Sequence, residues 1–432
     1  MSRRLIAALV LTVGVLTACG RPSSAVPNAG GYRLFLAEGD GNGAQVTVRD
    51  AATGTLERVL PVGVPAPDWS RYYTVSGVGS TTRLSAVDPG TGRTLSQLTI
   101  RSGCTFPTLT YPQLPGGISP HGAWLTLSMQ TVAAGARHSE FLVGPTSLVR
   151  PFTRLSLTGD FSFDAISNDG VSLYLIETMS VPSPSGGGQG GVVHYRVRLY
   201  DVATRALLEH PIADKREPND PMNGIRGDSV FTPDGNYVLT VYARNGGPFI
   251  HALPLGQPYA WCVDLPSTQP SNLEEQFQWS LVSNRDGSSV YVVNGVTGRI
   301  SEITPANLPE VHRTGQVSLI AAPVPPVAGL FTDAEAKGVH VNGAALSADG
   351  QTLFALDNAG IVAIDTATLK TRARYLGGGA VMSIRMSTDG RWLFAADVEN
   401  EQIFKLDPRT GKVAGHIASL STPWAILWAE AK

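Results

Sequence analysis

The sequence predicts an all-β fold, a β-propeller built from four-stranded antiparallel blades. Two short phrases alternate along the chain, one centred on an Asp-Gly turn and the other on an Asp-x-x-Thr turn, and apolar strands flank both. The pair of phrases returns every 40 to 65 residues, and no helical periodicity runs between the copies. Four antiparallel strands repeated at this spacing are typical of propeller blades, which pack face to face around an axis.

The first phrase predicts strands one and two of each blade. LSADGQTLFALD (346–357) and MSTDGRWLFAAD (386–397) show it most clearly, with an apolar stretch, Ser, one residue, Asp-Gly and a second apolar stretch. Glycine supplies the positive φ that such a tight hairpin turn requires. Further copies occupy 117–127, 165–177, 230–242 and 281–294, and APDWSRYYTVSG (66–77) is a degenerate copy without Asp-Gly.

The second phrase predicts strands three and four. It reads strand, Asp-x-x-Thr with a frequent Gly, then strand, and it occurs at 46–62, 84–100, 197–213, 361–377 and 403–418. Weaker versions lie at 141–158, 250–265 and 300–319. Every first phrase therefore has its partner, and each predicted blade has both of its hairpins.

The two ends of the folded region predict how the ring closes. Residues 32–38 read as a second strand with no first strand before them, and TPWAILWAEA (422–431) is a first strand with nothing after it. An open ring would expose two apolar blade faces, so we expect the C-terminal strand to complete the N-terminal blade of a single domain, 32–431. First strands near residues 66, 117, 164, 228, 279, 344, 383 and 424 give eight blades. Seven is the alternative, because the copy near residue 66 lacks its turn.

The repeat resembles that of the YVTN-family β-propellers. That family's repeat runs Ser-Pro-Asp-Gly, then Tyr-Val-x-Asn, then a strand ending Ile-Asp-x-Ala-Thr, then an apolar strand closing in Val-Gly. YVVN (291–294) and IDTAT (364–368) match the second and third of these elements position by position. The likeness covers most of 32–431, more weakly over 100–160 and 215–275. It implies the propeller architecture but not an activity, because the superfamily includes both surface proteins and some enzymes.

The first 18 residues predict a secretory signal peptide. MSRR is basic, LIAALVLTVGVL is an apolar run too short to span a membrane, and LTAC (16–19) resembles the lipobox of bacterial lipoproteins. That resemblance implies cleavage before Cys19 and diacylation of its sulfur, and several acyl chains on one residue anchor stably. Residues 19–31 then read as the lipidated cysteine and a flexible tether. We expect an exported protein held at the outer surface of the cytoplasmic membrane or at the outer membrane; an ordinary signal peptide is the alternative.

The composition of the chain limits the kinds of partner that the protein is expected to bind. A net charge of −2 and the lack of a lysine-rich run exclude nucleic acid as a ligand, and they leave the lipid on Cys19 as the expected contact with a membrane. Cys104 and Cys262 fall in distant predicted blades, so we expect two separate thiols rather than a disulfide. Trp424 and Trp428 in the closing strand are expected to help seal the ring. We expect a monomer, and no cofactor is predicted.

The long connections gather on one face of the predicted ring. In a propeller the turns joining strands one to two and three to four share a face, and all other connections share the opposite face. The first set is short in this chain, and the second set holds the insertions 101–116, 129–139, 179–193, 213–228, 267–276 and 322–338. Long loops in a compact domain are commonly functional, so this face is the predicted binding surface.

Most of the acidic residues have a structural explanation. The aspartates of the two kinds of turn are expected to bond their own backbone rather than a ligand; they are Asp50, Asp88, Asp169, Asp201, Asp234, Asp286, Asp349, Asp365, Asp389 and Asp407. His121 stands at the aspartate position of its blade and is interpreted as a turn variant. The sequence contains no HExxH, CxxC or GxSxG pattern, so neither a transition-metal site nor a Ser-His-Asp triad is predicted.

The candidate binding residues are polar side chains at the entry of first strands, where they border the axis on the long-loop face. They are Arg226, Asp228, Gln278, His340 and Asn342, with Asp214, Lys215 and Arg216 on a neighbouring loop. Ordinary solvation is the alternative for each of them.

The sequence leaves two functions open. The first is a membrane-tethered module that binds or scaffolds an envelope protein, a glycan or a small ligand through the long-loop face. A lipoprotein that assists outer-membrane barrel assembly is similar in anchor and blade count, but its repeat has a Trp a few residues after Thr-Gly, which TGR (91–93) and TGK (410–412) lack. The second is a lactonase-like or quinoprotein-like enzyme with a site at the channel mouth, since propellers related to the YVTN group include both.

Overall fold

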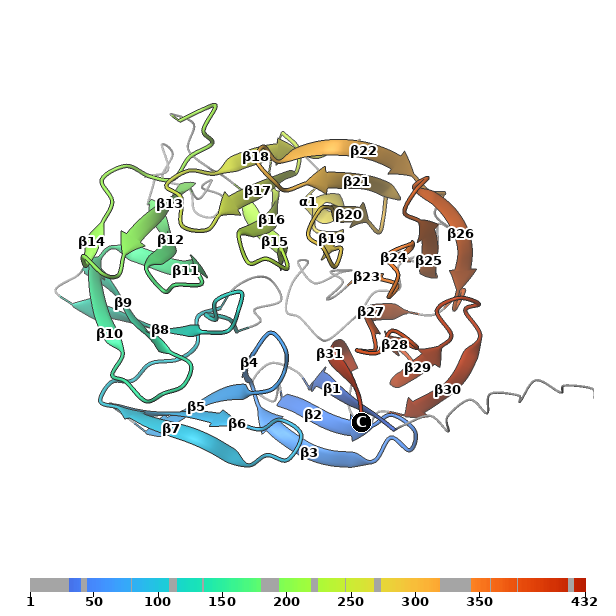
Figure 1. Ribbon diagram of the computed structural model, residues 1–432, viewed down its shortest axis with the longest axis horizontal. Coiled ribbons are helices and arrows are strands. Elements are labelled where there is room, and N and C mark those ends of the chain that lie inside the picture. Colours follow the sequence, from blue (N-terminus) through green and yellow to red (C-terminus); the bar gives the residue numbers. More distant parts are fainter. Residues whose placement is uncertain are drawn as a thin grey trace, which may run out of the picture.

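Eight β-sheets form a closed ring (Figure 1). The computed structural model describes residues 31–39, 45–78, 80–108, 115–133, 136–179, 194–218, 224–244, 246–267, 273–318, 343–357, 359–378, 380–418 and 423–432. Within these ranges the chain forms 31 strands and one short helix, α1 (Leu273–Gln276). No helix in the described ranges is long and apolar enough to cross a membrane. The predicted β-propeller is confirmed with eight blades, so the seven-bladed alternative is wrong.

The blades follow one another along the chain, and each runs from an innermost strand at the axis to an outermost strand at the rim. Blade one is β31 (Pro423–Ala431), β1 (Tyr32–Glu38), β2 (Gln45–Asp50) and β3 (Leu56–Pro61). Blade two is β4 (Gly63–Pro65), β5 (Tyr72–Val78), β6 (Thr81–Val87) and β7 (Thr94–Ile100). Blade three holds β8 (Trp124–Ala133), β9 (Ala136–Pro145) and β10 (Thr153–Thr158). Blade four is β11 (Asp160–Ile166), β12 (Ser172–Met179), β13 (His194–Asp201) and β14 (Ala206–Leu207).

The second half of the ring repeats the same order. Blade five is β15 (Ile225–Phe231), β16 (Tyr237–Ala243), β17 (Phe249–Pro254) and β18 (Trp261–Asp264). Blade six is β19 (Trp279–Ser283), β20 (Val290–Asn294), β21 (Arg299–Thr304) and β22 (Glu310–Gln316). Blade seven is β23 (Ala344–Leu346), β24 (Thr352–Asp357), β25 (Gly360–Asp365) and β26 (Lys370–Tyr375). Blade eight is β27 (Val381–Met386), β28 (Leu393–Asp397), β29 (Gln402–Leu406) and β30 (Val413–Ala418).

Blade three differs from the sequence-based expectation in two ways. Its innermost position is occupied by the single bridge Ile118–Leu125 instead of a full strand. The segment 129–139, expected to be a loop, extends the hairpin: β8 and β9 pair as far as Ala133 and Ala136. The loop prediction was wrong for this segment because a run of small and polar residues can continue a ladder through backbone hydrogen bonds alone.

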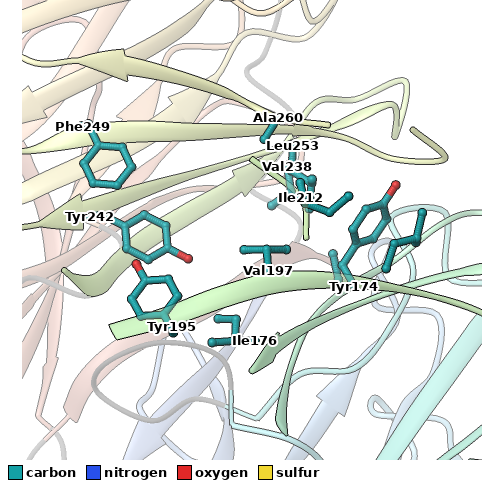
Figure 2. Close-up of a cluster of buried hydrophobic side chains, with 12 residues drawn as sticks. Tyr174, Ile176, Tyr195, Val197, Ile212, Val238, Tyr242, Phe249, Leu253 and Ala260 are labelled. Atoms are coloured by element: carbon teal, nitrogen blue, oxygen red, sulfur yellow. The ribbon is translucent and has the colours of Figure 1, made fainter. Parts of the chain in front are cut away.

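The hydrophobic core is divided into layers between neighbouring blades. A separate buried cluster fills each of the eight interfaces, and the one between blades four and five is drawn in Figure 2. The middle strands of a blade are therefore nearly continuously apolar, as in LFALD of β24, because both of their faces pack against another sheet. The outermost β22 alternates between exposed and half-buried residues, since only one of its faces has a neighbour.

The hydroxyl and the aspartate of the first phrase build its turn. Ser347 Oγ accepts the Thr352 N–H at 2.9 Å and donates to Asp349 Oδ1 at 2.6 Å, and Asp349 Oδ1 accepts the Gln351 N–H at 3.0 Å. The same three bonds recur around Ser387 and Asp389. The repeated phrase is thus a self-contained hydrogen-bonded unit, and its aspartates have the structural role that the sequence indicated.

The C-terminal strand closes the ring as predicted. β31 pairs with β1 along its length, from Tyr32 opposite Ala431 to Glu38 opposite Pro423. Trp428 of this strand stacks on Trp69 of blade two, with ring centroids 5.9 Å apart and an interplanar angle of 13°. Trp69 also packs on Phe35 of β1 at 4.8 Å, so one side chain of blade two contacts both the closing strand and the strand that it pairs with.

Candidate functional site

The connections divide the ring into two unlike faces. Turns joining strands one to two and three to four have four to seven residues, and we call their side the short-turn face. The opposite side, the long-connection face, carries every other connection. Five of these have 14 residues or more: 101–117, 180–193, 208–224, 265–278 and 317–343. The predicted division of connection lengths is confirmed except at 129–139, which belongs to β8 and β9.

Two carboxylates stand at β-bulges of neighbouring innermost strands. Asp164 is the extra residue between Phe163 and Ala165 in the pairing of β11 with β12. Asp228 lies in the bulge between Arg226 and Ser229, where β15 pairs with β16. A bulge re-aims the side chain of its extra residue and is common beside functional sites.

Arg226 links blades five and four through Asp164. The guanidinium Nη2 lies 3.2 Å from Asp164 Oδ1, and Nη1 donates to the Phe163 carbonyl at 3.2 Å. Both side chains are almost entirely buried, at 14% and 3% exposed. Within the described structure, Asp164 Oδ2 and Arg226 Nε have no hydrogen-bond partner, so the pair retains one acceptor and one donor.

Asp228 makes a corresponding link from blade five to blade six. Its Oδ2 accepts the Leu281 N–H at 2.8 Å and its Oδ1 accepts the Ser229 N–H at 2.9 Å. Burial raises the pKa of the Asp228 carboxyl to about 6, against the two hydrogen bonds that favour its charged form. Gln278, just before β19, is buried, and its Oε1 has no partner in the described structure. The structure therefore places Arg226 and Asp228 on β15 and Gln278 just before β19, the neighbouring innermost strand.

The other predicted loop residues lie at the outer edge of blade five. Asp214 pairs in parallel with Ala260, next to the outermost strand β18. Its carboxylate accepts bonds from Arg216 at 2.7 and 3.0 Å and from the Cys262 N–H at 2.7 Å. Lys215 Nζ lies 4.6 Å from the centroid of the Tyr259 ring. The structure does not bring this group together with the axial residues.

Several predicted residues fall outside the described part of the chain. They are His340, Asn342 and Cys19, together with residues 180–193 of one insertion and the whole of the insertion 322–338. Their assignment stays a prediction.

A buried polar cluster that the sequence did not indicate lies beside the Asp164–Arg226 pair. Tyr195 of β13 and Tyr242 of β16 stack at 5.9 Å (Figure 2), and neither hydroxyl group has a hydrogen-bond partner in the described structure. His251 is 2% exposed, and burial lowers its pKa to about 4, so the ring is neutral at pH 7. Both tyrosines occupy positions where the strand pattern calls for an apolar residue, which is why no polar signal stands out in the sequence.

The two thiols are separate, as expected. Cys104 and Cys262 are free cysteines, and burial raises the pKa of both, that of Cys262 to about 12. A thiol with a raised pKa is a poor nucleophile and a poor metal ligand.

Among the described residues, no group of three or more His, Cys, Asp or Glu side chains could hold a metal ion. The axial groups can form ion pairs and hydrogen bonds with a ligand.

Fold and site together define an eight-bladed β-propeller with polar groups at the entry of its innermost strands. No family model and no curated protein matches the chain. Among solved structures it is similar to apo AztD from Citrobacter koseri, at 12% identity and a TM-score of 0.50, covering 93% of this chain and 97% of that one. It is also similar to the periplasmic gluconolactonase PpgL of Pseudomonas aeruginosa, at 17% identity and a TM-score of 0.44, covering 91% and 97%. At 12% identity the likeness to AztD shows the fold alone.

Proposed function

We propose that the protein is an exported, lipid-anchored β-propeller of the YVTN type that binds or scaffolds a partner through its long-connection face. The partner is an envelope protein, a glycan or a small ligand. One observation carries this proposal: both ends of the folded ring lie on the short-turn face, opposite the five long connections. The extracytoplasmic location follows from the predicted signal peptide and lipobox.

The position of the chain ends gives the anchored ring an orientation. The Lys432 N–H donates to the Gly31 carbonyl at 2.8 Å, and the Ala431 N–H donates to Thr388 Oγ1 in the short turn of blade eight at 3.1 Å. The tether 19–31 therefore enters the ring at the short-turn face. Fully extended, such a tether spans roughly 45 Å. A lipid on Cys19 keeps the short-turn face toward the membrane and turns the long-connection face away from it.

The long-connection face also has the chemical means to bind. Arg226 and Gln278 stand at the entry of β15 and β19 on this face, with one donor and one acceptor unused in the described structure. The carboxylates of the turns on the short-turn face are already engaged, because they accept hydrogen bonds from the backbone of their own turns, as Asp349 and Asp389 illustrate. The unused donor of Arg226 and the unused acceptor of Gln278 therefore lie on the face that points away from the membrane.

Site-specific photo-cross-linking in intact cells tests the binding face. Val296 lies in the connection between β20 and β21 on the long-connection face, and Val149 lies in the turn between β9 and β10 on the short-turn face; both are exposed. A photoreactive residue at 296 is expected to give a discrete adduct, and one at 149 is the matched control. Adducts from position 149 alone, or equal adducts from both positions, contradict the proposal.

The anchor has its own test. Cys19→Ser removes the sulfur that the lipid requires and is expected to move the protein from the membrane fraction to the soluble extracytoplasmic fraction. Retention of the variant in the membrane fraction contradicts the lipid anchor while leaving the assignment of the binding face open to the cross-linking test.

A further inference from the structure

Arg385 lies on the innermost strand of blade eight, next to the axis of the ring. It is the penultimate residue of β27, just before the short turn that contains Asp389. β27 and β31 are neighbours at the centre of the ring (Figure 1). Arg385 is half-buried as a residue, and desolvation of its guanidinium shows that this group stands among protein atoms.

An aromatic platform fixes the guanidinium. Its central carbon lies 5.5 Å from the centroid of the Trp428 ring. Trp428 is itself held, because it stacks on Trp69 at 5.9 Å with the two rings 13° from parallel. A guanidinium over an indole face is attracted by the ring and keeps its N–H groups free for another acceptor.

Arg385 has no ion pair and no hydrogen bond within the described structure, in contrast to Arg226 and Arg374, which are bound to Asp164 and Asp357. Asp389, the nearest carboxylate along the chain, accepts the Tyr32 hydroxyl instead, at 2.7 Å. Burial lowers the pKa of Arg385, and no neighbouring charge acts against that effect. A half-buried guanidinium with unused N–H groups is complementary to an oxyanion.

We infer that Arg385 and Trp428 form a binding site for a small oxyanion, a carboxylate or a phosphate group, beside the axis. Two guanidinium N–H groups match the two oxygens of such a group, and the indole holds the guanidinium plane in position. The site lies near the short-turn end of β27, away from the entry of β15 and β19, so it is independent of the binding face proposed above.

Calorimetric titration of the purified protein with inorganic phosphate and, separately, with acetate tests this site at constant ionic strength. We expect saturable binding of one of the two probes, and the one that binds identifies the class of oxyanion. Arg385→Gln is expected to lose affinity at least about tenfold, since it removes the charge and the paired donors. Arg83→Gln on β6, which removes an exposed arginine, is the matched control and is expected to bind as the wild type does.

Arg385→Lys separates charge from geometry. It keeps the positive charge and loses the paired N–H groups, so its affinity is expected to lie between those of the wild type and Arg385→Gln. Circular dichroism confirms that each variant is folded before titration. No saturable binding of either probe by the wild type, or equal affinity in wild type and Arg385→Gln, overturns the inference.

Discussion

Replacing Trp69 with glycine is expected to destabilise the ring less than replacing it with alanine, although glycine removes more of the side chain. The reason lies in the turn of blade two. In the six blades that keep Asp-Gly or its His-Gly variant, the glycine has a positive φ between 66° and 75° at Gly122, Gly170, Gly235, Gly287, Gly350 and Gly390. Trp69 occupies the corresponding position in blade two with φ 56°. Only glycine adopts this left-handed conformation without steric cost.

The expected magnitudes follow from burial and backbone strain. Trp69 is 7% exposed and packs on Phe35, Tyr72 and Trp428, so truncation to alanine should lower the free energy of unfolding by about 3–5 kcal/mol. Alanine keeps the left-handed backbone strain of about 1 kcal/mol, whereas glycine relieves it. The glycine variant should therefore lose about 2–4 kcal/mol. In a turn with negative φ the order would be reversed, because glycine costs more conformational entropy on folding.

Urea-induced unfolding of the wild type, Trp69→Ala and Trp69→Gly, followed by circular dichroism, measures this order. Trp428→Ala and the double variant complete a cycle that isolates the stack between the two indoles, expected to be worth about 0.5–1.5 kcal/mol. A glycine variant less stable than the alanine variant would refute the strain argument. A coupling energy near zero would refute the expectation that Trp428 helps to seal the ring.

Three further predictions concern buried ionisable groups. The carboxyl of Asp228 has a pKa of about 6 in the folded protein against an ordinary value of 3.8. Its protonation stabilises the folded state fully below about pH 4, and this stabilisation is lost as the pH rises to about 6. Asp228→Asn should therefore remove the loss of stability between about pH 4 and 6 that is measured by urea unfolding. Glu38→Ala leaves Arg49 buried without the carboxylate that it now contacts at 3.0 and 3.1 Å, and a loss of about 3–5 kcal/mol is expected in the same assay. Cys104 and Cys262 should resist a thiol reagent at pH 8 until urea unfolds the protein, because burial raises the pKa of both.

The architecture was predictable because each hairpin depends on local chemistry. The Ser347–Asp349 turn, for example, makes its bonds within a few residues, so its sequence is informative by itself. The closing strand was predictable for a related reason. A folded region that starts at a second strand and ends at a first strand can pair the backbone groups of both strands only if the two strands lie side by side in one blade. The structure also explains why the copy at 66–77 looks degenerate. Trp69 replaces the glycine of the turn and has a strained positive φ, but its ring stacks on Trp428 of the closing strand.

The site was only partly predictable, because its contacts join residues in different blades. Arg226 meets Asp164 across an interface between blades, and nothing in the intervening sequence marks that pair. Asp214 lies at the outer edge because the backbone of its segment pairs with Ala260, and a backbone hydrogen bond leaves no trace in side-chain pattern. Arg385 could not be recognised from its strand, because only the packing of the neighbouring blades shows that no described residue acts as its counter-ion.

The orientation of the ring at the membrane is the most direct test of the central claim that the chain ends and the anchor share the short-turn face. The lipidated protein would be reconstituted into vesicles that carry a quencher on their lipid headgroups, with a fluorophore on a cysteine at position 149 or at position 296, in a background without Cys104 and Cys262. The account predicts strong quenching at 149, on the short-turn face, and weak quenching at 296, on the long-connection face. Stronger quenching at 296 would contradict it.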